Sequence, residues 1–388
     1  MVIERIELFH YRNYEHLVLT PHEGINIFFG KNGSGKTNLL EAVHFCALGK
    51  SHRVSHDIHA VMSGQQEASC QVNVRDRMTQ NEITIRLQAG ENSVKSIWIN
   101  QKKAKKLSEM MGVLQCVIFS PEDLDLIKEG PSVRRRFLDM MISQISRPYF
   151  VALQQYRLAM DHRNAILRMA RVEGTRPDAM IRDFEISMAN HAKVIYELRK
   201  KYTDMLEIQG NRIYRQISGK EEESFHIQYH SFCKNDQEAN SFQEVLEKTR
   251  EDDLRQGVTG QGPHRDDLNL SLNRKSMKLF ASQGQMRTAA LSLKLAQLRI
   301  LAEISGESPI LLLDDVMSEL DLQRRMNLLQ EIGSTQTFIT CSDEGDLEEC
   351  QTNRTYFVYQ EENLAKIQET KEGPQIEKPQ FSEPDFSF

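Results

Sequence analysis

The pattern of apolar residues near the start of the chain predicts two strands followed by a helix. Apolar and polar residues alternate in places from Val2 to Thr20, which predicts an edge or sandwich strand with a turn near Arg12 and Asn13. Residues 25–29 are mostly apolar and predict a buried strand, and the stretch from Asn38 to Leu48 predicts a helix.

Antiparallel β structure is predicted for residues 68–120. Short strands are expected at Cys70 to Val74, Ile83 to Leu87 and Val94 to Ile99. The stretch from Val113 to Phe119 is almost wholly apolar, and we expect it to be a central strand.

The pattern changes at Ser120, and little strand and much helix are predicted from there to Leu254. Apolar residues then recur at alternating spacings of three and four, with His191 filling the one missing position, which predicts a long helix with a heptad-like stripe. The stripe consists of Ile181, Phe184, Met188, Ile195, Leu198, Tyr202 and Met205. We interpret the segment as an inserted domain whose two antiparallel helices form a short arm.

Composition restricts the class of protein. The chain has 388 residues and a net charge of −6, which argues against binding nucleic acid through overall positive charge, so any such contact must be a local patch. The six cysteines form no C-x-x-C pair, which disfavours a zinc site or a disulfide framework. We found no apolar run of 18 residues and no signal-peptide pattern, so a cytoplasmic protein without a membrane partner is expected.

One short stretch predicts a nucleotide site. It fits the pattern G, four residues, G-K-[S/T], and lies between the predicted strand and helix, as the motif requires. Its residues are Gly30, Lys31, Asn32, Gly33, Ser34, Gly35, Lys36 and Thr37. Backbone N–H groups of such a loop surround phosphates, Lys36 would reach the terminal phosphates, and Thr37 would hold Mg²⁺. We therefore expect ATP or GTP as the ligand.

A pair of acids completes this prediction. Four aliphatic residues, 310–313, precede Asp314 and Asp315, as in a buried parallel strand that ends beside a nucleotide. Asp314 is predicted to take Mg²⁺ and Asp315 to position the attacking water. Because the phosphate loop and these acids lie at opposite ends of the chain, the nucleotide domain must be assembled from both ends.

Two further motifs narrow the class. The run S-Q-G-Q at 282–285 precedes a long predicted helix and resembles the signature motif of ABC-type ATPases, and S-E-L-D at 318–321 resembles their D-loop. Together with the runs from Ser120 to Asp139 and from Gly262 to Leu268, the chain resembles the RecF family of bacterial recombination mediators over residues 1–360.

The resemblance implies an α/β fold, an ABC-type P-loop ATPase head related to SMC proteins. The expected divisions are a first part of the head at 1–120, an inserted helical arm at 121–254, a second part of the head at 255–365, and a disordered tail at 366–388. The tail ends with three aromatic residues among acids, from Phe381 to Phe388, for which a docking peptide and a featureless end remain alternatives.

The resemblance also implies site residues. Ser282, Gly284 and Gln285 would contact ATP bound to a second copy, so ATP would hold a homodimer together. Arg12 and Asn13 match a family position near the nucleotide. Met286 stands where the family usually has glutamine.

The implied activity is a weak, DNA-stimulated ATPase that acts as a switch. The predicted strand at 337–340 lacks the histidine that many ABC ATPases carry, so Thr340 or Ser342 would substitute and hydrolysis would be slow.

The implied partners are DNA with gaps or single-strand to double-strand junctions, RecO and RecR, and indirectly RecA.

Candidate DNA contacts are the loops from Lys50 to Arg53 and from Lys102 to Lys106, and the arginine-rich insertion. Between residues 131 and 172 there are eight arginines, no lysine and two acids, a local charge of +6. Salt bridges from Arg134, Arg135 and Arg136 to the acids at 122–125 are the alternative to DNA contact.

Two other classes remain as alternatives. An ABC subunit that drives another assembly, such as a transporter, would need a coupling surface for a membrane partner. A P-loop kinase or GTPase would have no use for the motifs at 282–285 and 318–321, and no guanine-reading N-K-x-D is present.

Overall fold

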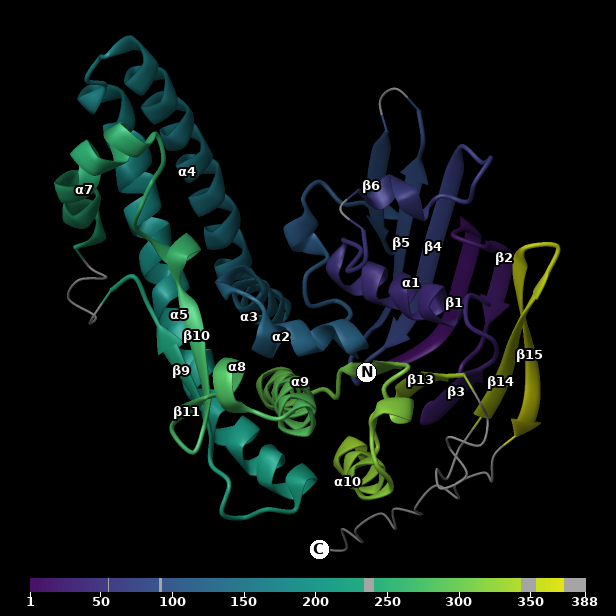
Figure 1. Ribbon diagram of the computed structural model, residues 1–388. Helices are drawn as coiled ribbons and strands as arrows, with labels where there is room; N and C mark the ends of the chain where they lie inside the picture. The colour runs from purple at the N-terminus through teal and green to yellow at the C-terminus, as the bar shows by residue number, and fades with distance from the viewer. Residues whose placement is uncertain (55, 91–92, 234–240, 343–353, 373–388) are drawn as a thin grey trace, which may run out of the picture.

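The central element is a six-stranded sheet assembled from both ends of the chain (Figure 1). The computed structural model describes residues 1–388 except 55, 91–92, 234–240, 343–353 and 373–388. Five strands of the sheet are parallel, and β15 pairs antiparallel with β14. In spatial order the strands are β15 (Leu364–Glu372), β14 (Arg354–Glu361), β3 (Ile25–Phe29), β13 (Thr337–Cys341), β12 (Ile310–Asp314) and β8 (Cys116–Phe119).

The central strands are buried on both faces, which is why they are nearly continuous in aliphatic and aromatic residues. Successive residues enter two different cores. Leu312 and Phe28 belong to the core that contains α1 (Lys36–Leu48), whereas Leu311 and Ile27 belong to the core that contains the arm helices. The sheet therefore separates the two cores and contributes to both.

The strand expected to be central, β8, lies at the edge of this sheet and pairs in parallel with β12, so the predictions of a central strand and of antiparallel structure up to residue 120 were wrong for it. Its outer side is covered by the last turn of α3 (Pro131–Ile145): the Gln144 side chain accepts a hydrogen bond from Cys116 N–H at 2.9 Å, and the Gln115 side chain donates to Gln144 O at 3.2 Å. An edge strand covered in this way is as buried as a central one, which explains its apolar sequence.

A second, antiparallel sheet packs over α1. Its strands in spatial order are β2 (Tyr14–Leu19), β1 (Val2–Tyr11), β4 (Glu67–Arg75), β5 (Gln80–Gln88), β6 (Val94–Ile99) and β7 (Lys102–Lys103). The strands predicted here are confirmed, including the turn at Arg12 and Asn13. One face of this sheet shares its core with α1 and with the central sheet.

The arm is a helical hairpin that extends away from the head (Figure 1). It consists of α4 (Arg147–Glu173) and α5 (Asp178–Ser218), with α7 (Phe242–Gln256) packed along it. The Ser146 hydroxyl caps α4 by accepting from Tyr149 N–H at 3.3 Å. Short helices precede α4 or connect other elements: α2 (Asp125–Lys128) and the 3₁₀ turns η1 (Asp57–Ala60), η2 (Leu107–Glu109), η3 (Pro121–Leu124), η4 (Pro263–Arg265) and η5 (Met317–Glu319).

A three-stranded sheet lies against α5 and leads back to the head. Its strands are β9 (Phe225–His230), β10 (Asp267–Leu272) and β11 (Lys275–Ser276). Because β9 precedes residue 254 and β10 follows it, this sheet joins the two sides of the predicted boundary, which itself stays a prediction. The chain returns through α8 (Met277–Phe280) and α9 (Gln283–Ser305), and α10 (Leu322–Ile332) follows β12.

The tail begins later than predicted. Residues 366–372 form most of β15, and Ala365 N–H donates to Asn13 O at 2.7 Å, which ties this strand to the first hairpin. Residues 373–388, including the aromatic and acidic end from Phe381 to Phe388, lie outside the described residues.

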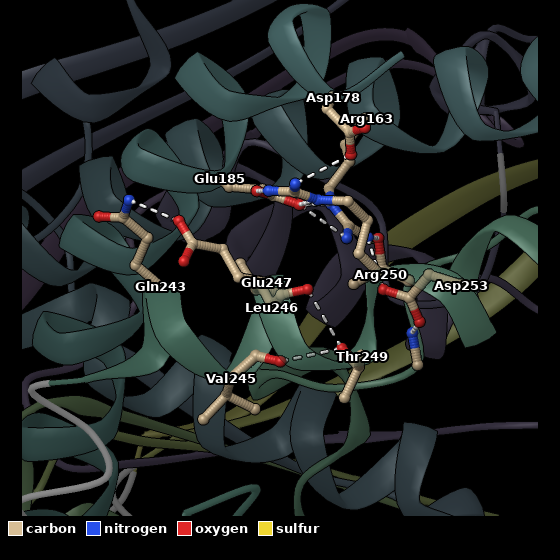
Figure 2. A network of polar contacts seen from close by, with 12 residues as sticks. Arg163, Asp178, Glu185, Gln243, Val245, Leu246, Glu247, Thr249, Arg250 and Asp253 are labelled. Atoms are coloured by element: carbon tan, nitrogen blue, oxygen red, sulfur yellow. Dashed lines mark hydrogen bonds and ion pairs between the residues drawn. The ribbon is translucent and has the colours of Figure 1, made fainter. Parts of the chain in front are cut away.

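Charged residues are buried between the arm helices (Figure 2). Glu185 of α5 is paired with Arg163 of α4 at 2.9 Å and with Arg250 of α7 at 2.5 Å. Arg163 also donates to Asp253 at 2.7 Å and to the Thr259 hydroxyl at 2.8 Å. Arg163 and Glu185 have no exposed surface, so this network ties three helices together in the interior of the arm.

None of the helices among the described residues is long and apolar enough to cross a membrane.

We predict that Arg163→Met lowers the free energy of unfolding by about 3–5 kcal/mol, because it leaves Asp253 as a buried charge without its partner. Urea unfolding measures this change. Arg168→Met, an exposed arginine on the same helix, is the control and should change stability by less than about 0.5 kcal/mol. Equal effects of the two variants would contradict a buried ion network.

Candidate nucleotide-binding site

The loop between β3 and α1 has a backbone that requires glycine at two points. At Gly30 (φ 151°) an added Cβ would lie 2.0 Å from Val358 O, and at Gly35 (φ 120°) it would lie 2.8 Å from Ala365 Cβ and 3.0 Å from Asn13 Oδ1. The loop is therefore packed tightly against β14, β15 and the first hairpin. Its shape depends on segments from both ends of the chain.

Lys36 is held inside the loop. Its Nζ donates to Gly30 O at 2.6 Å and to Lys31 O at 3.1 Å, and only 5% of the residue is exposed. Burial lowers the pKa of Lys36, which the charges of Asp315 and Asp314 partly oppose. An ammonium group placed among carbonyl oxygens at a helix start can exchange those weak acceptors for phosphate oxygens.

Asp314 connects three segments that are far apart in the sequence. Its Oδ1 accepts hydrogen bonds from the hydroxyls of Thr37 at 2.9 Å and of Thr340 at 2.6 Å. Burial raises the pKa of Asp314, and the bonds from the two hydroxyls oppose that shift. The two residues predicted to hold Mg²⁺, Thr37 and Asp314, are thus in direct contact.

Asp315 has a strained backbone and an unused oxygen. Its φ is 54°, an uncommon value for a residue other than glycine, and its N–H donates to the Thr340 hydroxyl at 3.0 Å. Its Oδ1 is buried and has no hydrogen-bond partner among the described residues. Backbone strain and an unpaired buried carboxylate oxygen both cost stability, and such features concentrate at functional sites.

Two residues outside the sequence motifs, Ser342 and Gln360, also contact the phosphate loop. The Ser342 hydroxyl donates to Asn32 Oδ1 at 3.0 Å, and the Gln360 side chain donates to Gly33 O at 2.9 Å. Ser342 was considered as a substitute for the missing histidine, and its position beside the loop agrees with that role, which stays a prediction. Gln360 was missed because no sequence signal places β14 next to β3.

Arg12 and Asn13, which were predicted to lie near the nucleotide, contact different parts of the site. The Arg12 guanidinium donates to both carboxylate oxygens of Glu41, at 2.6 and 2.9 Å, and Glu41 is fully buried in α1. Burial acts to lower the pKa of Arg12, but the hydrogen bond to Glu41, the charge of Glu41 and the contact with Tyr11 together raise it above its ordinary value. The Asn13 side chain instead donates to Ser34 O at 3.3 Å. Asn13 thus supports the loop directly, whereas Arg12 orients the helix behind it.

The residues of the S-x-G-Q motif begin α9. The Ser282 hydroxyl accepts from Gln285 N–H at 3.3 Å, and the Gln285 side chain accepts from Ser282 N–H at 2.9 Å, so the two form a capping box. Gln285 also donates to Glu223 at 3.1 Å. None of the contacts made by Ser282, Gly284 or Gln285 in the described structure is with the phosphate loop of the same chain. Met286 is partly buried against the larger core, where a glutamine amide would lose part of its hydration.

Two hypotheses were given for Arg134, Arg135 and Arg136: contact with DNA, or salt bridges to the acids at 122–125. Neither describes Arg134. Its guanidinium binds Asp267 through two hydrogen bonds, at 2.7 and 2.9 Å, and 8% of the residue is exposed. Arg135 donates to Asp266 O at 2.7 Å. The predicted acidic partners at 122–125 and the predicted DNA contact by Arg134 were therefore wrong, because the run Gly262–Leu268 supplies the partners. Of the three arginines, Arg136 alone is exposed.

The two basic loops differ in their charge. Burial lowers the pKa of His52 to about 4, so the first loop carries only Lys50 and Arg53 as cations at neutral pH. The four lysines of the second loop, between residues 102 and 106, are all exposed. The second loop thus presents more exposed positive charge to an anion than the first loop does.

Comparison with known proteins agrees with this site. The family model described as RecF/RecN/SMC N terminal domain matches residues 2–366, and the chain has the ABC-type ATPase head fold of those proteins. Within that class the chain belongs to the RecF family.

Two curated relatives, each named DNA replication and repair protein RecF, show the extent of the match. The chain is 38% identical to the protein of Clostridium novyi over 88% of this chain and 92% of the relative, and 40% identical to that of Clostridium botulinum over 90% and 95%.

Solved structures give the same result. A structure of the recombination mediator protein RecF with ATP in the RecFOR pathway superposes with a TM-score of 0.86 at 33% identity, covering 95% of this chain and 97% of that chain. An SMC head bound to the C-terminal winged-helix domain of ScpA gives 0.57 at 15% identity, covering 95% and 98%, and shows a shared fold alone.

We predict a pH dependence from His52. Burial gives it a pKa of about 4 in the folded chain against about 6.5 when unfolded, so the unfolded state binds the proton first as pH falls. Stability should therefore be complete above about pH 6.5 and fall by about 3 kcal/mol toward pH 4 through this group. Urea unfolding at several pH values should show a smaller loss for His52→Asn. The exposed His230→Asn is the control, and identical pH profiles for all three proteins would contradict the prediction.

Proposed function

We propose that this chain is an ATP-gated DNA-binding protein of recombinational repair and replication. The observation that carries the proposal is the junction at Asp314, where the phosphate-loop hydroxyl of Thr37 meets the paired acids while Asp315 keeps an unpartnered buried oxygen. Most buried polar groups that only stabilise a fold are hydrogen-bonded, so an unpartnered carboxylate oxygen beside the phosphate loop favours a ligand site. This arrangement suits a ligand that brings both phosphate oxygens and a metal ion.

The residues fit ATP with Mg²⁺. Lys36 would bind the β- and γ-phosphates together with the backbone N–H groups of the loop, and Thr37 with Asp314 would hold the metal. Bound Mg²⁺ would neutralise charge on the phosphates. Burial raises the pKa of Asp314 because it disfavours the charged form of the carboxylate. A bound cation would stabilise that charged form.

Hydrolysis would be slow. Asp315 would orient the attacking water through its free oxygen, with its backbone fixed by the Thr340 hydroxyl. Thr340 and Ser342 stand where other ABC ATPases have a histidine, and hydroxyls are poor general bases near neutral pH. A slow, DNA-stimulated reaction serves a switch better than a motor.

A second copy of the chain would complete the site. Ser282 is exposed at the start of the 23-residue helix α9, whose first N–H groups favour an anion. Leu279 and Phe280, just before it, are 73% and 69% exposed, an apolar surface that a partner would cover. ATP on one protomer would thus lie against Ser282 and Gly284 of the other, and loss of the γ-phosphate would release the dimer.

The DNA and protein partners follow from family membership. We propose binding to gapped DNA or single-strand to double-strand junctions, and cooperation with RecO and RecR in loading RecA. The exposed lysines between residues 102 and 106 would supply sequence-independent phosphate contacts. No observation favours the transporter-subunit alternative.

We predict that wild-type protein sediments as a dimer with ATP and as a monomer with ADP, and that DNA binding follows the dimer. Ser282→Arg should raise the dimer Kd at least about 30-fold, because a bulky charge enters the interface. Its ATP affinity should be unchanged. Ser305→Arg, at the other end of the same helix, is the matched control and should still dimerise. Dimerisation of Ser282→Arg at wild-type strength would overturn the shared site.

We also predict that Asp315→Asn lowers ATP turnover at least about 100-fold while ATP affinity and dimerisation remain. Asparagine tolerates the positive φ at this position, so the backbone should be kept. Steady-state hydrolysis and sedimentation with ATP measure the two effects. Wild-type turnover itself should be below about one per second. Unchanged turnover in Asp315→Asn would exclude Asp315 as the residue that orients water.

A further inference from the structure

The arm contains a pocket that the nucleotide site does not use. It lies between α3, α4 and the turn η4, and its volume is about 310 Å³, at the lower end of the range for ligand pockets. Its polar lining includes Ser132, Arg135, Arg136, Arg157, Arg199 and His264. None of these residues belongs to the phosphate loop, the paired acids or the S-x-G-Q motif.

The pocket has an excess of positive charge. Four arginines line it against two acids, Asp139 and Asp161. Asp139 is already paired with Arg157 at 3.0 Å and with Arg199 at 2.7 Å. Burial lowers the pKa of His264 to about 4, so that ring is neutral at physiological pH. The lining therefore carries a net charge of +2.

One of the four arginines has a structural role, and the other three could bind a ligand. Arg199 is 2% exposed, and its guanidinium donates to Asp139, Asp266, Pro263 O and the Tyr149 hydroxyl. Because its donors are used by these protein groups, Arg199 forms part of the pocket wall and is not a ligand for phosphate.

In contrast, Arg135 makes one hydrogen bond, to Asp266 O, and Arg136 makes none among the described residues. Burial and the nearby charge of Arg199 lower the pKa of Arg135, and the charges of Asp266, Asp139 and Asp267 oppose that shift only in part. Arg157 is 60% exposed and binds Asp139 through one of its nitrogens.

The geometry suits a phosphate group. Ser132 lies in the first turn of the 15-residue helix α3, and Arg135 and Arg136 follow it at positions i+3 and i+4, which places all three on one side of the helix. A hydroxyl at a helix start and several guanidinium groups are the donors that bind phosphate oxygens best. A group with a charge near −2 would balance the lining.

The back wall of the pocket is rigid. A Cβ added at Gly262 (φ 134°) would lie 2.2 Å from the Tyr156 hydroxyl, and that hydroxyl bonds His264 Nδ1 at 2.7 Å. Asp266 accepts from Arg199 at 2.7 Å and from Phe232 N–H at 2.9 Å. The back wall is therefore preformed, and a ligand would bind without reordering that wall.

We propose that this pocket is a phosphate-binding site of the arm, with Arg135, Arg136, Arg157 and Ser132 as its ligands. The phosphate would come either from a DNA backbone or from a free phosphate ion. The first source rests on the proposed function; the second does not. Binding of DNA here would extend its contact from the head onto the arm.

The test compares two double variants with equal loss of charge. Arg136→Gln/Arg157→Gln removes two ligands of the pocket, whereas Arg147→Gln/Arg168→Gln removes two exposed arginines of α4 that do not line it. Urea unfolding first establishes that both variants keep the stability of the arm. The single variant Arg136→Gln, at an exposed position, repeats each measurement if the pocket double variant is unstable.

The first measurement is duplex DNA affinity with ATP at several salt concentrations. If the phosphate belongs to DNA, the pocket variant should bind about tenfold more weakly and its slope of log affinity against log salt should fall by about 1, with no such change in the control variant.

The second measurement is the melting temperature in phosphate against chloride at equal ionic strength, with ADP saturating the nucleotide site. If a free phosphate is the ligand, phosphate should raise the melting temperature of the wild type and of the control variant but not of the pocket variant.

The proposal is overturned if the pocket variant matches the control variant in both measurements. Failure of the wild type to bind DNA at all would refute the proposed function, and the melting comparison would still decide whether the pocket binds phosphate.

Discussion

The strand that carries the phosphate loop pairs on both sides with strands from the other end of the chain. β3 lies between β13 and β14, and these two parallel pairings bring Thr340, Ser342 and Gln360 to the loop. The same constraint governs the arm. The chain leaves the sheet after β8 and returns in β12. Because these strands pair in parallel, the connection must cross from the C-terminal edge of the sheet to its N-terminal edge, and the arm is part of that crossover. The nucleotide site and the arm are therefore consequences of a single sheet order.

The head and arm are not independent bodies. The larger core includes residues of the central sheet, of α3 to α5 and of α9, and Ser282 stands at the start of α9. Buried ion pairs also connect the helices of this core. Arg134 joins α3 to Asp267 at the start of β10, and Arg199 joins α5 to Asp139 and Asp266. Because breaking such pairs leaves buried charges, the start of α9 and the arm should move together.

The sequence predicted the features that depend on local pattern. The phosphate loop, the strand ending in Asp314 and Asp315, and the helical hairpin each carry their signal within a few residues or turns of helix. Features that depend on distant pairing were missed or wrong. β8 is as apolar as a central strand because Gln144 covers its edge, and Arg134 finds Asp267 rather than the nearer acids. Nothing in the local sequence around Gln360 or Glu41 reveals a role, since each acts through a residue far along the chain.

The position of β3 also bears on how the chain is made. The neighbour β13 is synthesised about 300 residues after β3, a delay of about 15–60 s at ordinary rates of translation. The antiparallel sheet and the arm hairpin pair within themselves and can fold during that interval, whereas β3 remains without its partners. A nascent chain stopped before β13 would thus hold a complete phosphate-loop sequence and an unpaired apolar strand, the kind of surface that chaperones bind.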